Sequence, residues 1–109
     1  MNVMHAADAK LIDLGGGTTR RILAYNDSMM MVEVAMEQGS VGTPHTHPHA
    51  QSTYVKSGRF RFTIDGKEEE VAAGDSLAFP PNILHGTVCL EKGVLIDIFS
   101  PMREDFLKK

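Results

Sequence analysis

The residues with the clearest chemical potential are two histidines and a glutamine within residues 39–58. His45 and His47 lie two residues apart, and Gln51 keeps the same parity. Alternate residues of an extended strand point to the same face, so these three side chains can converge on one point. Imidazole nitrogen and amide oxygen are acceptable ligands for a divalent cation such as Zn, Ni, Co, Fe or Mn. The stretch therefore predicts three ligands of a metal site.

A fourth candidate ligand, His85, follows a short apolar segment and a Pro-Pro-Asn turn. The alternative is that His85 is a hydrogen-bonded core histidine and that His45 and His47 form a hydrogen-bonded pair beside a loop. Buried imidazoles without partners cost stability, whereas a cation makes use of them. His49 shares the parity of His47, but Pro48 interrupts the strand ladder before it. We expect His49 beside the ligands or on the surface.

A carboxylate within an apolar run forms the second candidate group. Asp97 shares a face with Leu95 and Phe99 in a strand predicted over residues 94–99. A carboxylate there needs a cation or hydrogen bonds, or its pKa rises. If that face lines a cavity, Asp97 can transfer protons, Phe99 can wall a sugar or apolar ring, and Arg103 can clamp a carboxylate. The alternative is an Asp97–Arg103 ion pair that fastens the tail, and spacing alone leaves both readings open.

Short strands are the elements that must position these groups. Alternating hydrophobicity predicts strands over residues 20–25, 29–36, 59–64, 67–70, 83–90 and 94–99. Asp65-Gly66 is a hairpin signal, and Glu91-Lys92-Gly93 predicts another turn. About eight short antiparallel strands without a convincing helix indicate an all-β sandwich or barrel.

Two spaced motifs resemble those of the cupin superfamily. The first is G(X)5HXH(X)3Q(X)6G over residues 39–58, and the second is G(X)5P(X)4H over residues 74–85. Gln51 replaces the glutamate usual in cupins, and Asn82 and Cys89 replace the usual glycine and asparagine. The resemblance implies a single-domain double-stranded β-helix, or jelly-roll barrel, over residues 1–109. Residues 1–10 have no clear period, and we expect them to form a loosely held N-terminal arm.

Further segments resemble the small KdgF-type cupins of pectin and alginate breakdown. They are Asp13-Leu-Gly-Gly-Gly, Arg21-Ile-Leu-Ala-Tyr, His45-Thr-His-Pro-His-Ala-Gln51, His85-Gly and residues 95–107. The resemblance implies conversion of 4,5-unsaturated monouronates, released by pectin or alginate lyases, to linear 5-keto-4-deoxyuronate by acid-base ring opening and tautomerisation. It implies the metal ligands His45, His47, Gln51 and His85. It also implies the reactive residues Asp97, Phe99 and Arg103.

The glutamine bears on the type of chemistry. Three neutral imidazoles and the neutral Gln51 amide leave the whole charge of a divalent ion uncompensated by the protein, so the site should attract anions and polarise oxygen. We therefore expect one divalent transition metal (Ni, Zn, Mn, Fe or Co), a small anionic sugar acid as substrate, and a reaction without redox. Two alternatives stay open: a metal-dependent dioxygenase, and a non-catalytic cupin that senses a sugar or a metal.

Composition bounds the remaining possibilities. The chain has 109 residues, 42% of them hydrophobic, and a net charge of −3, which indicates one globular domain without a basic surface for nucleic acid or an anionic membrane. No apolar run approaches the roughly 20 residues of a transmembrane helix. The single cysteine, Cys89, excludes an internal disulfide, is expected as a buried small hydrophobe, and fits a cytoplasmic location. The resemblance implies a homodimer paired through an edge strand within residues 11–25.

Overall fold

A computed structural model describes residues 1–108 of the chain. Its strands are β1 (Ile12–Gly15), β2 (Thr18–Asn26), β3 (Met29–Met36), β4 (Val41–His45), β5 (Ala50–Ile64), β6 (Lys67–Ala72), β7 (Ser76–Phe79) and β8 (His85–Ser100). A 3-10 turn, η1 (Ala6–Asp8), and a single helical turn, α1 (Glu104–Leu107), flank them. The prediction of an all-β fold is confirmed.

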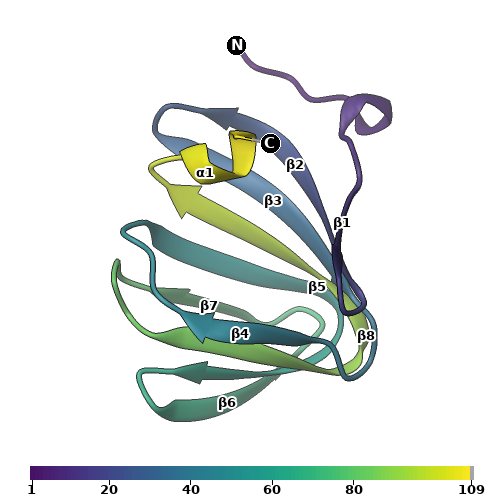
Figure 1. Cartoon of the computed structure of the whole chain (residues 1–109), viewed down its shortest axis with the longest axis vertical. Helices are drawn as coiled ribbons and strands as arrows, with labels where there is room; N and C mark the ends of the chain where they lie inside the picture. The colour runs from purple at the N-terminus through teal and green to yellow at the C-terminus, as the bar shows by residue number, and fades with distance from the viewer. Residues whose placement is uncertain (109) are drawn as a thin grey trace.

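All eight strands belong to one antiparallel sheet that curls around a common interior (Figure 1). The strand order is β1-β2-β3-β8-β5-β6, while β4 pairs with β8 and β7 pairs with β5. Helix α1 lies at the end of the barrel where β8 finishes (Figure 1). Because β8 pairs with β3, β4 and β5, its side chains face partners from three segments that are distant in sequence.

The turn predicted at residues 91–93 is wrong, because β8 runs through it without a break. Strands β5 and β8 are 15 and 16 residues long and pair along almost their whole length, with register shifts around Ser57. At Gly93 the backbones of β5 and β8 approach each other closely: a Cβ there would collide with the Ser57 carbonyl and with Gly58. Gly58 itself has a positive φ of 82°. The glycines therefore mark a tight crossing of two long, bent strands, which local sequence does not distinguish from a turn.

Two apolar clusters fill the barrel. The larger contains Met36, Val55, Phe60, Phe62, Cys89 and Leu95, and the smaller contains Met30, Val32 and Phe99. Val34 packs against both. The even-numbered residues of β3 thus face inward, as their period of two predicts, and Cys89 is a buried free thiol.

The N-terminal arm lies outside the barrel (Figure 1). Its η1 turn was not predicted, and the Asn2 side-chain amide donates a 2.7 Å hydrogen bond to the Tyr25 carbonyl. Ala9 is buried. Within residues 1–108, no helix is both long and apolar enough to span a membrane.

Candidate metal centre

The three predicted histidine ligands come together at one end of the barrel. His45 ends β4 and His85 begins β8, and the two residues are direct cross-strand partners. The His47 ring lies 5.7 Å from that of His45 and 4.7 Å from that of His85, centroid to centroid. One ring nitrogen from each histidine lies within 4.8 Å of the others. The strand pairing thus gathers residues 40 positions apart into one cluster.

Backbone carbonyls orient two of the imidazoles. Nδ1 of His45 lies 2.8 Å from the Thr43 carbonyl oxygen, and Nδ1 of His85 lies 2.9 Å from that of Ile83. A carbonyl oxygen only accepts hydrogen bonds, so each Nδ1 carries the hydrogen and each Nε2 keeps its lone pair. This is the tautomer and support that metal-bound histidines commonly have.

Gln51 lies beside the histidine cluster. Its Oε1 lies 3.0 Å from His47 Nε2, while its Nε2 donates a 2.9 Å hydrogen bond to the Thr53 hydroxyl. The amide is therefore oriented with its oxygen toward the histidines. The 3.0 Å contact is a hydrogen bond that His47 Nε2 donates to the amide oxygen, so these two atoms face each other beside the histidine cluster.

The residues fit a divalent metal by their chemistry as well as their spacing. His47 and His85 are 6% and 5% exposed, and this burial lowers the pKa of both imidazoles, so the neutral, ligating form is favoured. The cluster of potential ligands contains His45, His47 and His85 but not His49. The ring of His49 packs against those of His47 and Phe99, at 5.5 and 6.4 Å.

Asp97 adjoins this cluster through two hydrogen bonds. The Thr53 hydroxyl donates to its Oδ1 at 2.6 Å, and Gln51 Nε2 makes a longer contact of 3.4 Å with the same oxygen. Removal of the carboxyl group from water raises the pKa of Asp97 from 3.8 to about 6, although these two donors and Arg103 oppose the shift. The carboxyl group can therefore both accept and release a proton near neutral pH.

The ion pair in the tail differs from the one considered from the sequence. Arg103 donates to both carboxylate oxygens of Asp105, at 3.0 and 2.8 Å, so the reading of an Asp97–Arg103 ion pair is wrong. The guanidinium of Arg103 lies 5.0 Å from the Phe99 ring centroid and 4.2 Å from that of Phe106. Asp105 is a better partner because it lies in the same short turn and brings a fully bidentate geometry.

One cavity of about 340 Å³ joins these groups. Six of the predicted site residues line it: His45, Gln51, His85, Asp97, Phe99 and Arg103. Four larger hollows, of about 500 to 520 Å³, have no imidazole in their walls, and two of them lie beneath the N-terminal arm. We therefore place the chemistry in the smaller cavity.

Several residues around the cavity were not predicted. Arg20 and Phe106 line it, and the Thr53 hydroxyl donates a hydrogen bond to Asp97. Thr53 lies two residues after Gln51, and this shared parity is the signal that could have identified it. Arg20 shares its parity with the apolar Ile22, which marks the inward face of β2.

The antiparallel sheet curled into a barrel, with a histidine cluster at one end, is the architecture of a cupin. A family model for the cupin domain matches residues 32–99, and the chain belongs to this family. It is 45% identical over 97 residues to the pectin degradation protein KdgF of Dickeya dadantii (strain 3937), covering 87% of this chain and 88% of that one.

Solved structures give the same relationship. An RmlC-like cupin from Shewanella frigidimarina NCIMB 400 is 40% identical with a TM-score of 0.91, covering 95% of this chain and 94% of that one. KdgF from a Halomonas species is 35% identical with a TM-score of 0.90, covering 95% and 96%. The resemblance to KdgF-type cupins is thus confirmed in both sequence and structure.

Proposed function

We propose that the protein converts 4,5-unsaturated monouronates to linear 5-keto-4-deoxyuronate. The observation that carries this proposal is the position of Asp97, whose carboxyl group lines the cavity and is hydrogen-bonded to Gln51 beside the three histidines. The similarity to two KdgF proteins, one of them named for pectin degradation, supports a uronate produced by a pectin or alginate lyase as the substrate.

Side chains of this chain would supply the metal ligands. His45, His47, His85 and the Gln51 amide oxygen would hold one divalent ion of the Ni, Zn, Mn, Fe or Co group. When bound, such an ion supplies Lewis acidity and a positive field for an anionic substrate. The protein ligands are all neutral, so this field is not reduced by a coordinated carboxylate.

Asp97 moves the proton in this mechanism. Its carboxylate accepts the proton of the anomeric hydroxyl as the bond between C1 and the ring oxygen breaks, which leaves an aldehyde at C1 and an enolate at C5. The same proton then passes to C4, and the enolate becomes a ketone. One proton changes place, no electron is gained or lost, and no water is consumed. Thr53 and Gln51 fix the carboxyl group through hydrogen bonds to Oδ1.

The aromatic and cationic residues position the sugar. Phe99 presents its ring to the cavity and packs edge-on against His47 and Phe106. Arg103 is held by Asp105 over this ring and clamps the substrate carboxylate from the tail side. A rigid apolar wall and a fixed charge restrict the orientation of a small anionic sugar.

The direct test uses metal-loaded protein and freshly prepared unsaturated galacturonate and guluronate. We expect the ring-alkene absorbance to fall faster than in a protein-free control, and chelation to remove the acceleration. Absence of acceleration with a fully loaded site would reject the proposal and direct attention to oxygen uptake, the property of a dioxygenase, or to ligand binding without turnover.

We also propose a cytoplasmic homodimer. Strand β1 is an edge of the sheet; Leu14 within it and Leu11 just before it are exposed, at 47% and 55%. A second subunit could pair with this edge and cover both leucines. Sedimentation of the wild-type protein and of the Leu14→Glu variant tests this: the dimer should dissociate in the variant, and a monomeric wild type would reject it.

A further inference from the structure

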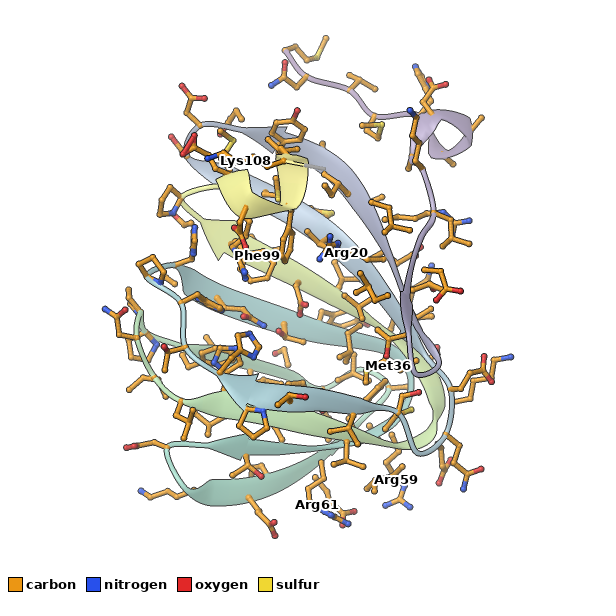
Figure 2. All side chains as sticks on the ribbon, viewed as in Figure 1. Arg20, Met36, Arg59, Arg61, Phe99 and Lys108 are labelled. Carbon is orange, nitrogen blue, oxygen red and sulfur yellow. The ribbon has the colours of Figure 1, made fainter. Side chains whose placement is uncertain are left out.

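Arg20 projects into the same cavity as the candidate catalytic group. In the sheet, Arg20 pairs with Val34 and Val34 pairs with Leu95, so Arg20 lies in an inward-facing row. The adjacent row contains Val32, which pairs with Asp97. Along each strand the two rows are two residues apart, or about 7 Å. Figure 2 shows Arg20 and Phe99 on the α1 side of the barrel, where both line the cavity.

Within residues 1–108, the guanidinium of Arg20 forms no ion pair with a carboxylate. Its central carbon lies 3.9 Å from the centroid of the Phe106 ring, and its Nε is buried without a hydrogen-bond partner within residues 1–108. A buried donor without an acceptor is unfavourable and is uncommon in folded proteins. The cavity therefore contains a cation with at least one unpaired hydrogen-bond donor, its Nε.

The neighbouring Arg103 is in a different electrostatic state. Both guanidinium groups contact Phe106, but Arg103 is neutralised by the bidentate bond to Asp105. Burial, followed by the charge of Arg103, lowers the pKa of Arg20 below its usual value, and the nearby carboxylate of Asp105 opposes this shift only in part. An anion in the cavity would oppose the shift further.

We propose that Arg20 binds the substrate carboxylate and makes the site selective for sugar acids over neutral sugars. This inference rests on the proposed function and adds a second, unneutralised arginine to the site. A guanidinium forms two parallel hydrogen bonds with a carboxylate, a geometry that suits a planar anion. The hydroxyl groups of a neutral sugar offer no planar, charged partner of this kind.

The position of Arg20 also orients the sugar. In the sheet order, β2 carries Arg20, β8 carries Asp97 and β5 carries Gln51, so Asp97 lies between the arginine and Gln51. A uronate held by Arg20 through its carboxylate would place its ring over Asp97 and extend its other end toward the histidines. The volume of about 340 Å³ lies at the lower end of small-molecule sites, about 300 to 1,000 Å³, and suits one sugar ring.

Binding of two non-reactive probes tests the inference. Affinities for D-galacturonate and for neutral D-galactose are measured by calorimetry on the metal-loaded wild type and on Arg20→Gln, Arg20→Lys and the control Arg21→Gln. Arg21 is the matched control because it faces the other side of β2, where it pairs with Glu33 at 3.5 Å. Metal content and melting temperature are recorded for each variant.

We expect Arg20→Gln to weaken galacturonate binding by about 10- to 100-fold and to leave galactose binding unchanged. The galacturonate affinity of Arg20→Lys should lie between those of the wild type and Arg20→Gln, because lysine keeps the positive charge but lacks the planar guanidinium group. Arg21→Gln should match the wild type. Equal losses for both probes would assign Arg20 a structural role as a tether for Phe106 and overturn the inference.

Turnover separates this inference from the proposed function. If the wild type opens unsaturated uronates and Arg20→Gln retains the wild-type KM, the function stands and the role of Arg20 is rejected. If the wild type shows no turnover but prefers galacturonate through Arg20, the anion site stands and the catalytic proposal fails. A wild type without any preference for galacturonate over galactose overturns the inference directly.

Discussion

Thr53 and Asp97 are cross-strand partners of β5 and β8, and the Thr53 hydroxyl donates a 2.6 Å hydrogen bond to Asp97 Oδ1. Thr53 is only 1% exposed, so water cannot replace this donor. The same hydroxyl accepts a hydrogen bond from Gln51. The pair therefore connects the proposed proton-transfer group to the candidate metal ligands through one rigid, buried bridge.

Replacement of Asp97 by asparagine tests the proton-transfer role. The amide cannot accept and return the proton, and general acid-base catalysis contributes about 10²- to 10⁴-fold to a rate. We expect kcat of Asp97→Asn to fall by that factor while the metal content, measured by elemental analysis, stays at the wild-type value. A variant with wild-type activity would remove Asp97 from the mechanism.

Replacement of Thr53 by valine tests the support of Asp97. Valine preserves the shape of threonine but cannot donate to the carboxylate, so the pKa of Asp97 should rise further. Loss of one hydrogen bond to a charged group corresponds to about one pH unit. In a profile of kcat against pH, the acid limb of Thr53→Val should move upward by that amount.

Ser52→Ala is the matched control for this change. Ser52 precedes Thr53 in β5, is exposed, and lies on the opposite face of the strand. The acid limb of the kcat profile of Ser52→Ala should coincide with that of the wild type. Coincident profiles for Thr53→Val and wild type would show that the Thr53 hydroxyl does not set the protonation of the catalytic group.

The spacing of the first motif indicated correctly that His45, His47 and Gln51 lie close together, but the geometric reason differs. His45 ends β4, Gln51 lies in β5 and His47 lies in the loop between them, so the side chains converge through a bend of the chain and not through alternation along one strand. The pairing of His45 with His85 is not local, since it depends on the antiparallel contact between β4 and β8. Only the resemblance to the cupin motifs anticipated that contact.

The misread features are those in which tertiary contacts override local signals. Gly93 has the composition of a turn residue, but it lies within β8 because only glycine fits against Ser57 and Gly58. Arg20 was not singled out from the sequence: its parity with Ile22 places it on the inward face of β2, but its contact with Phe106 depends on α1 folding back over the cavity. Neither the fit of Gly93 nor the contact of Arg20 can be derived from periodicity alone.

The metal-free protein should show a characteristic dependence of stability on pH. The pKa of Asp97 is 3.8 in the unfolded reference and about 6 in the folded protein, so the folded state holds the proton more tightly. The contribution of Asp97 to the free energy of unfolding therefore falls as pH rises from about 4 to 6 and is constant above that range. The total change is up to about 3 kcal/mol.

Asp97→Asn removes this dependence. In the presence of a chelator, we expect the variant to be more stable than the wild type at pH 8 by up to about 3 kcal/mol, and the two to converge near pH 4. Urea titrations at several pH values measure the difference. A difference that does not vary with pH would contradict the raised pKa of this carboxyl group.

Removal of one histidine at a time tests the metal centre itself. His47 is buried and faces Gln51 and His85, whereas His49, two residues later, is half-buried and lies outside the cluster. We expect His47→Ala to weaken binding of Zn or Ni by more than about 100-fold, because loss of a ligand exceeds the 10- to 100-fold effect of losing an outer partner. His49→Ala should retain most of the affinity.

Thermal denaturation gives a second measure of the same site. A ligand that binds only the folded state stabilises it by about 2.7 kcal/mol when its free concentration is 100 times the dissociation constant. Added metal should therefore raise the melting temperature of the wild type and of His49→Ala, and leave that of His47→Ala unchanged. Equal stabilisation of all three proteins would mean that the ion binds elsewhere, because the only variant that lacks a candidate ligand would then behave like the proteins that keep all four.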